Sequence, residues 1–438
     1  MSWQRTLDDH LFGPGPKRIL SLDGGGVRGL VTLGLLQRVE DILKARSGQG
    51  EEFRLCDYFD LIGGTSTGGI IATLLALGFT VAEVQALYLK LCPDVFQQTS
   101  TWRTLSGLWG FRLPKFDPSA FKRNVDSVIE AYVSRVGMPG QEPTLGSAHL
   151  KTGLGVVMKR IDTGSVWVLT NNSRMKWWDP ASPHWKHTID DPKQRFFPNK
   201  DYALRTLALA TASAPFYLDA VEIGISPGRV GLFLDGGASP FNNPAIELFL
   251  MTTLKQFDEH GQLDPQRPFS PFGFDWETGE DKLFLYSVGT GTFRTEIDRT
   301  VYKNQFNLMK AKDALRAVID DGMKSSLIWL QALSEPNEPF RVDENLCEMR
   351  GLRVMREKLL TFKRINPLLN HDWLKREIGI EFTDRVLART REFDNADRAN
   401  LTRLDKIGKA AGEKLVGEND FPPRFDPAPF GGRAPPAA

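Results

Sequence analysis

Hydrophobic and polar positions in the first 80 residues repeat one pattern twice, at residues 18–44 and 58–77. Each repeat begins with a short apolar run, continues into a glycine-rich loop and ends in a stretch with helical spacing of leucine, valine and isoleucine. The apolar runs are short enough to be buried strands, and the glycine-rich loops occupy residues 23–29 and 63–69. Successive strand–loop–helix units predict an α/β fold with a mostly parallel sheet.

The pattern continues through the middle of the chain and then changes. Further strand candidates are residues 155–158, 165–170, 231–234 and 283–288, and further helices are expected at 80–92, from 119, from about 202 to 212, and at 243–257. Beyond residue 292, helical spacing and many charges predict a mainly helical extension. We therefore expect a loose N-terminal arm at 1–16, an α/β domain at 17–291, a helical extension packed on it at 292–417, and a disordered Pro/Gly-rich tail at 418–438.

Ser66 lies at a predicted strand-to-helix turn with the spacing G-x-S-x-G, between Gly64 and Gly68. This setting is typical of a nucleophile elbow, in which a tight turn exposes the serine hydroxyl above the sheet. Glycines suit the turn because neighbouring Cβ atoms would be crowded and because the backbone is expected to need φ values that glycine tolerates. The alternative is a tight glycine turn without chemistry.

Gly24, Gly25 and Gly26 follow the first predicted strand and precede a helix. Because sites of parallel α/β sheets lie at the carboxyl ends of the strands, this loop and the serine turn are expected to share one crevice. Three consecutive backbone N–H groups without side chains are suited to hold the oxyanion of an ester's tetrahedral intermediate. The alternative is a phosphate-binding loop, although the spacing matches neither of the usual phosphate-loop patterns.

Asp235 is the strongest candidate for the base that a serine nucleophile needs. It ends an apolar strand and is followed by Gly236, and a carboxylate whose pKa is raised by apolar surroundings can act as a base directly. The other interpretation is a turn in which the aspartate caps its own backbone. His260 would complete a Ser–Asp–His order and remains an alternative base.

Composition narrows the class of partner. A hydrophobic fraction of 41%, a charged fraction of 25% and a net charge of +1 are ordinary for a soluble protein and give no reason to expect a nucleic acid polymer. Three cysteines, Cys56, Cys92 and Cys347, have neither disulfide nor zinc spacing, which favours a reducing compartment. The N-terminus lacks an apolar signal core and no stretch is long enough to span a membrane. We expect a cytoplasmic protein that needs no metal or cofactor.

Two segments have charge patterns with a second interpretation. Residues 101–113 interleave Trp and Leu with Arg and carry no acidic residue, so they are either a loop packed on the body or a segment that enters a lipid interface. Residues 350–414 contain 16 Lys and Arg against 10 Asp and Glu. That surplus is either a solvated helix face or a surface for an anionic ligand.

Five stretches taken in order resemble the patatin-like phospholipases. They are residues 23–29 (DGGGVRG), 64–68 (GTSTG), 212–216 (ASAPF), 235–237 with 242–244 (DGG and NNP), and 287–291 (SVGTG), and residues 115–118 (KFDP) also look like a family element.

The resemblance implies a three-layer α/β/α fold of the FabD/lysophospholipase-like type, with residues 17–291 as the catalytic domain. It implies a Ser66–Asp235 dyad, an oxyanion hole at Gly24–Gly26 supported by Arg28, and hydrolysis of lipid acyl esters without calcium. Stand-alone bacterial enzymes of this kind include cyclic-nucleotide-activated effectors of anti-phage defence that attack the inner face of the cell membrane. A cyclic dinucleotide activator and a homo-oligomer are therefore further expectations, and a catalytically silent lipid-binding module is the alternative function.

Overall fold

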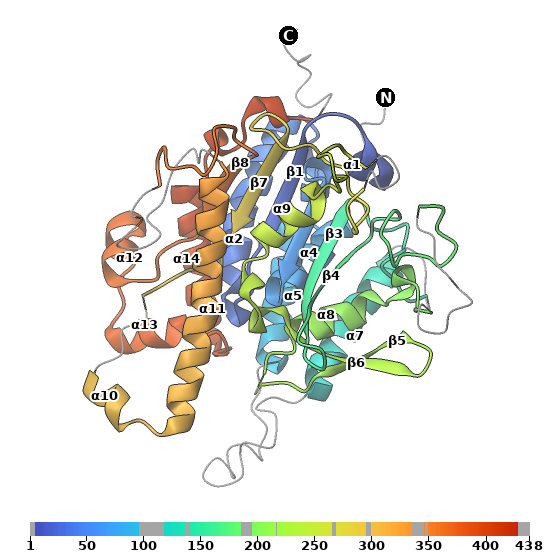
Figure 1. Cartoon of the computed structure of the whole chain (residues 1–438). Helices are drawn as coiled ribbons and strands as arrows, with labels where there is room; N and C mark the ends of the chain where they lie inside the picture. The colour runs from blue at the N-terminus through green and yellow to red at the C-terminus, as the bar shows by residue number, and fades with distance from the viewer. Residues whose placement is uncertain are drawn as a thin grey trace.

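The computed structural model describes residues 5–95, 118–135, 141–184, 195–215, 217–264, 269–294, 299–334, 346 and 349–427. Within these residues the chain forms one eight-stranded sheet with helices on both faces (Figure 1). The expected segments at residues 101–113 and 115–117 lie outside the described residues.

The strands run in the order β5-β6-β3-β2-β1-β7-β8, with β4 paired to β3 alone. In the spatial order β3-β2-β1-β7-β8 each strand is parallel to its neighbour. The pairs β3–β4, β3–β6 and β5–β6 are antiparallel. The expected mostly parallel sheet is therefore confirmed. The strands are β1 (Lys17–Leu22), β2 (Leu61–Thr65), β3 (Gly153–Arg160), β4 (Val166–Thr170), β5 (Val221–Ser226), β6 (Arg229–Asp235), β7 (Leu283–Val288) and β8 (Thr361–Ile365).

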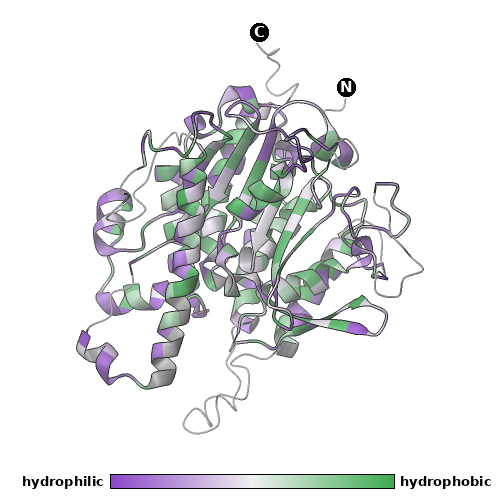
Figure 2. Ribbon diagram, viewed as in Figure 1, coloured by the Kyte–Doolittle hydropathy of each residue, from purple (hydrophilic) through white to green (hydrophobic). Residues whose placement is uncertain are grey.

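Alternate residues of the central strands enter two separate cores, which produces three layers. Leu20 and Ile62 face one core, and their neighbours Ile19 and Leu61 face the other. Hydrophobic residues concentrate on these strands and on the helix faces toward them (Figure 2).

One layer contains α2 (Gly29–Ser47), α4 (Thr67–Ala76), α5 (Val81–Val95), α7 (Pro118–Arg135), α8 (Leu204–Ala212) and α14 (Arg398–Leu415). The opposite face is covered by α9 (Ala245–Thr253) and α11 (Asn307–Ala332). Shorter helices are α1 (Leu7–Phe12), α3 (Leu55–Tyr58), α10 (Arg299–Asn304), α12 (His371–Ile378) and α13 (Asp384–Arg391). The expected three-layer α/β/α architecture is thereby confirmed.

The region after residue 292 contains a strand as well as helices. β8 pairs with β7 and extends the parallel sheet, which the sequence pattern did not reveal. The strand was not expected because it contains two adjacent cations, Lys363 and Arg364. Each of them is buried in an ion pair with an aspartate that is distant in the sequence. Helix α14 packs closely on α2, with Gly34 against Gly408, so this region covers one face of the sheet's helical layer.

The described residues near each end of the chain are more ordered than expected. The arm at 1–16 was expected to be loose, but α1 is anchored by buried His10 and Leu11. The tail from 418 was expected to be disordered, and this is wrong for residues 418–427, where Phe421 and Phe425 are fully buried. Residues 428–438 lie outside the description.

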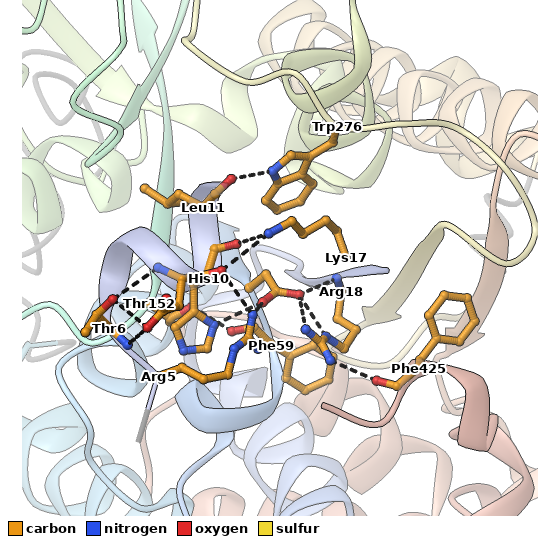
Figure 3. Close-up of polar contacts among 12 residues, drawn as sticks. Arg5, Thr6, His10, Leu11, Lys17, Arg18, Phe59, Thr152, Trp276 and Phe425 are labelled. Atoms are coloured by element: carbon orange, nitrogen blue, oxygen red, sulfur yellow. Dashed lines mark hydrogen bonds and ion pairs between the residues drawn. The ribbon is translucent and has the colours of Figure 1, made fainter. Parts of the chain in front are cut away.

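A buried charge cluster explains why both ends are fixed (Figure 3). Asp60 accepts hydrogen bonds from Arg5 and Arg18 and lies 3.1 Å from His10 Nδ1, while Arg18 also donates to the carbonyl of Phe425 at 2.9 Å. Although burial opposes ionisation, the two guanidinium groups and His10 hold the pKa of Asp60 well below its usual range. The cluster therefore joins the N-terminal segment, β1 and the C-terminal segment at the amino edge of the sheet.

No helix in the described part of the chain is long and apolar enough to cross a membrane.

Candidate active site

Ser66 lies between the end of β2 and the start of α4, as the spacing predicted. Its φ of 56° makes it the one non-glycine residue with positive φ among those described. A serine held in this sparsely populated conformation is characteristic of a nucleophile elbow.

The glycines around Ser66 permit close approach rather than unusual φ values. A Cβ on Gly64 would overlap the carbonyl of Gly68, and one on Gly68 would overlap the carbonyl of Leu22. Neither glycine has a φ in the left-handed region, so the expectation about their backbone was wrong: the serine itself carries that conformation. Gly236 is equally confined, because a Cβ there would press on the carbonyl of Val157.

Asp235 lies directly beside the serine hydroxyl. Ser66 Oγ donates to Asp235 Oδ2 at 2.6 Å, and the N–H of Gly237 donates to Asp235 Oδ1 at 2.7 Å. The capping turn and the serine contact therefore coexist on different oxygens of one carboxylate. Burial raises the pKa of Asp235 to about 6, and the hydrogen bonds from Ser66 and Gly237 partly oppose that increase.

Two residues that the sequence analysis did not select fix the positions of this pair. Thr211 Oγ1 accepts from the N–H of Ser66 at 2.9 Å and donates to the carbonyl of Val157 at 2.6 Å. The carbonyl of Ser213 accepts from the N–H of Asp235 at 2.9 Å. Residue 211 directly precedes the ASAPF stretch and residue 213 belongs to it. That stretch was the sequence signal that could have pointed to both residues.

The glycine loop lies against Ser66, but only part of it is available as a candidate oxyanion hole. A Cβ added to Gly24 would lie 3.0 Å from Ser66 Cβ. The N–H of Gly24 already donates to the carbonyl of Asn242 at 3.0 Å, so the expectation that it binds the oxyanion does not fit this structure. Within the described residues, the N–H groups of Gly25 and Gly26 have no acceptor, which leaves them as the candidate donors.

Arg28 joins the glycine loop to the loop after β7. Its Nη1 donates to the carbonyl of Gly291 at 3.1 Å, and its guanidinium lies 5.5 Å from the ring centre of Phe293. Both contacts fit the supporting role expected for this residue.

An apolar pocket of about 130 Å³ opens beside Ser66 and Asp235. Its walls come from α4, α5, α7 and α8, and from Phe393 in the loop between α13 and α14. Its apolar lining includes Ile70, Leu74, Val84, Leu87, Leu91, Phe121, Val125 and Val128. Such a lining suits a hydrocarbon chain, with the polar pair at one part of the wall.

His260 lies away from this site. It follows α9 at an exposed turn, with a side-chain exposure of 75%. The final turn of α9 contacts Trp276, whose Nε1 donates to the carbonyl of Leu11 in α1, the helix that precedes β1. His260 therefore follows the helix end at the amino edge of the sheet, opposite Ser66, and the alternative Ser–Asp–His arrangement is not formed.

Comparisons with known proteins agree on one family. The family model described as "Patatin-like phospholipase" matches residues 20–249. Patatin-like protein 1 of Arabidopsis thaliana is 44% identical over 430 residues, which cover 85% of this chain and 91% of that protein.

Two other relatives match over shorter stretches. Patatin-like protein 2 of Arabidopsis thaliana is 29% identical over 296 residues, 64% of this chain and 60% of that protein. A cGAMP-activated phospholipase of Vibrio cholerae serotype O1 is 46% identical over 235 residues, 52% of this chain and 56% of that protein. The chain thus spans 60% or less of the length of these two relatives.

Proposed function

The chain belongs to the patatin-like phospholipase family, and on that premise we propose that it hydrolyses carboxylic esters of phospholipids and related lipids through a Ser66–Asp235 dyad. The observation that carries the proposal is the 2.6 Å hydrogen bond from Ser66 Oγ to Asp235 Oδ2 at the edge of an apolar pocket. A nucleophile paired with a buried base, next to space for an acyl chain, is what ester hydrolysis of lipids requires.

Acylation begins when Asp235 accepts the proton of Ser66 and Ser66 Oγ attacks the ester carbonyl carbon. The oxyanion that forms is held by the N–H groups of Gly25 and Gly26, the loop donors that have no acceptor among the described residues. The intermediate collapses with breakage of the bond to the alcohol oxygen. The proton on Asp235 passes to that oxygen, and the acyl group remains on Ser66.

Deacylation repeats these steps with water. Asp235 accepts a proton from the water molecule, whose oxygen attacks the acyl carbon, and the same proton returns to Ser66 as the fatty acid leaves. A pKa of about 6 keeps Asp235 largely ionised at neutral pH while leaving it basic enough to accept a proton.

The test is product analysis by mass spectrometry after incubation with mixed phospholipid vesicles. Ser66→Ala and Asp235→Asn should each lower fatty acid release by roughly 10⁴–10⁶-fold, because the two residues act as a unit. His260→Ala, remote from the site, is the matched control and should retain full activity. Full activity in Asp235→Asn would overturn the dyad, and no labelling of Ser66 by a fluorophosphonate probe would favour a silent lipid-binding module.

We propose, as a second candidate function, activation by a cyclic dinucleotide at the cytoplasmic face of a membrane. The name of the Vibrio cholerae relative, a cGAMP-activated phospholipase, supports it, since that protein is 46% identical over 52% of this chain. Phospholipid release would be measured with and without a panel of cyclic dinucleotides, and the oligomeric state would be followed in parallel. Equal release in all conditions would end this proposal and leave the hydrolase proposal intact.

A further inference from the structure

Asp23, the first residue of the glycine loop, is bound by a residue more than 300 positions away. Arg364 on β8 donates from Nη1 to Asp23 Oδ1 at 2.8 Å and from Nη2 to Asp23 Oδ2, and Nη1 also donates to Ser287 Oγ at 2.8 Å. Both charged side chains are 5% exposed. A buried two-pronged ion pair of this kind fixes direction as well as distance, because the guanidinium plane and the carboxylate plane align.

The other end of the loop is held by the same region of the chain. The N–H of Val27 donates to the carbonyl of Phe393 at 2.8 Å, and the backbone of Gly26 is packed against that same carbonyl. The N–H groups of Gly25 and Gly26, which have no acceptor within the part of the chain that the structure describes, lie between these two anchors. Neither anchor residue lies within residues 20–249, the part that the family model matches.

We propose that Arg364 is a positioning residue for ester hydrolysis, which holds Asp23 so that the N–H groups of Gly25 and Gly26 point to where the oxyanion of the intermediate forms. This inference rests on the proposed function, and it assigns to the C-terminal region a part in the reaction beyond covering the sheet. Arg364 touches no reacting atom and acts through Asp23. Lysine cannot replace it fully, because one ammonium group cannot bind both carboxylate oxygens in a fixed plane.

β8 supplies a matched control for the loss of a buried ion pair. Lys363, the preceding residue, points to the opposite face and pairs with Asp420 at 2.7 Å, with side-chain exposures of 3% and 8%. Lys363→Gln therefore removes a buried charge from the same strand without touching the glycine loop. Arg364→Gln removes the loop anchor, and Arg364→Lys keeps the charge but loses the two-pronged contact.

The experiment measures steady-state hydrolysis of a soluble ester and hydrogen exchange of the amides at residues 23–29 in the full-length chain. Arg364→Gln should lower kcat about 10- to 100-fold with little change in KM, since small displacements of catalytic groups have effects of this size. Its amides at 23–29 should exchange faster. The pH at which kcat/KM falls on the acidic side, which is set by the pKa of Asp235, should not change. Arg364→Lys should fall between Arg364→Gln and wild type, and Lys363→Gln should retain kcat and loop protection.

Wild-type kcat, or unchanged exchange at residues 23–29, in a folded Arg364→Gln protein would overturn the inference. If Arg364→Gln fails to fold, Arg364→Lys decides, and wild-type kcat and loop protection in that variant would overturn it too. Failure of the proposed function has a different signature: wild type and Ser66→Ala would release equal amounts of product, whatever the loop exchange shows.

Discussion

Two regions of this chain contribute to one site in different ways. Residues 17–291 supply the groups that would touch the reacting ester: the hydroxyl of Ser66, the carboxylate of Asp235 and the N–H groups of the glycine loop. Residues 292–427 supply none of these, yet they add a strand to the sheet, cover α2 and hold both ends of the glycine loop. The difference shows that the groups proposed to react all come from one region of the chain, whereas their geometry also depends on contacts with the other region.

The largest expected effect comes from removing the second region altogether. A chain that ends at residue 291 loses β8 from the sheet edge and α14 from α2, and so exposes apolar surface that is buried in the full chain. We expect no cooperative thermal unfolding and no ester turnover, measured by circular dichroism and fatty acid release. A chain that ends at residue 427 keeps all the described contacts and is the control. A folded, active 1–291 fragment would show that the first region is self-sufficient.

Phe421 tests whether the second region contributes stability separately from chemistry. Its ring packs on Tyr58, Phe284 and Tyr286, with ring centres 5.0–6.3 Å away. Phe421→Ala should lower the free energy of unfolding in urea by about 3–5 kcal/mol, while kcat of the folded protein stays unchanged. Phe421→Leu, which leaves a smaller cavity, should lose less. A loss below about 1 kcal/mol in Phe421→Ala would mean that this segment is peripheral after all.

The pH dependence of hydrolysis probes the first region alone. Because Asp235 must be ionised to accept the serine proton and its pKa is raised to about 6, kcat/KM should rise with pH and level off above that value. Below it, each pH unit should cost about tenfold, as protonated Asp235 cannot act as the base. The pH profile of Lys363→Gln should coincide with that of wild type. A limb near pH 4, the ordinary range of an aspartate, would show that burial does not raise the pKa of Asp235.

Thr211 gives the smallest expected effect and tests positioning from within the first region. Thr211→Val keeps the shape but loses the acceptor for the N–H of Ser66, so kcat should fall about tenfold and stability by ~1 kcal/mol. Thr253→Val, which removes a helix-internal hydroxyl bond to Phe249 in α9, is the control and should alter stability alone. Unchanged kcat in Thr211→Val would show that the elbow holds its geometry without this contact.

The sequence by itself determined the candidate groups of the site and the order of most elements. Ser66 and Asp235 could be selected because each lies at the end of a strand and next to small residues. Such a pattern involves only residues that are close together in the sequence, so it can be recognised without the structure. The mostly parallel sheet followed from alternating strand and helix patterns, and the structure agrees.

Only the tertiary structure decided which backbone groups remain available and what holds them. The N–H of Gly24 is taken by Asn242, and a lone sequence cannot reveal such a partner because hydrogen bonds between loops depend on how the loops meet. Likewise, the sequence of β8 does not indicate a buried strand, because it contains two adjacent cations. Lys363 and Arg364 can be buried only because Asp420 and Asp23 pair with them. Burial of a charge depends on a partner brought near by folding, and that is why the anchors of this site could not be found along the chain.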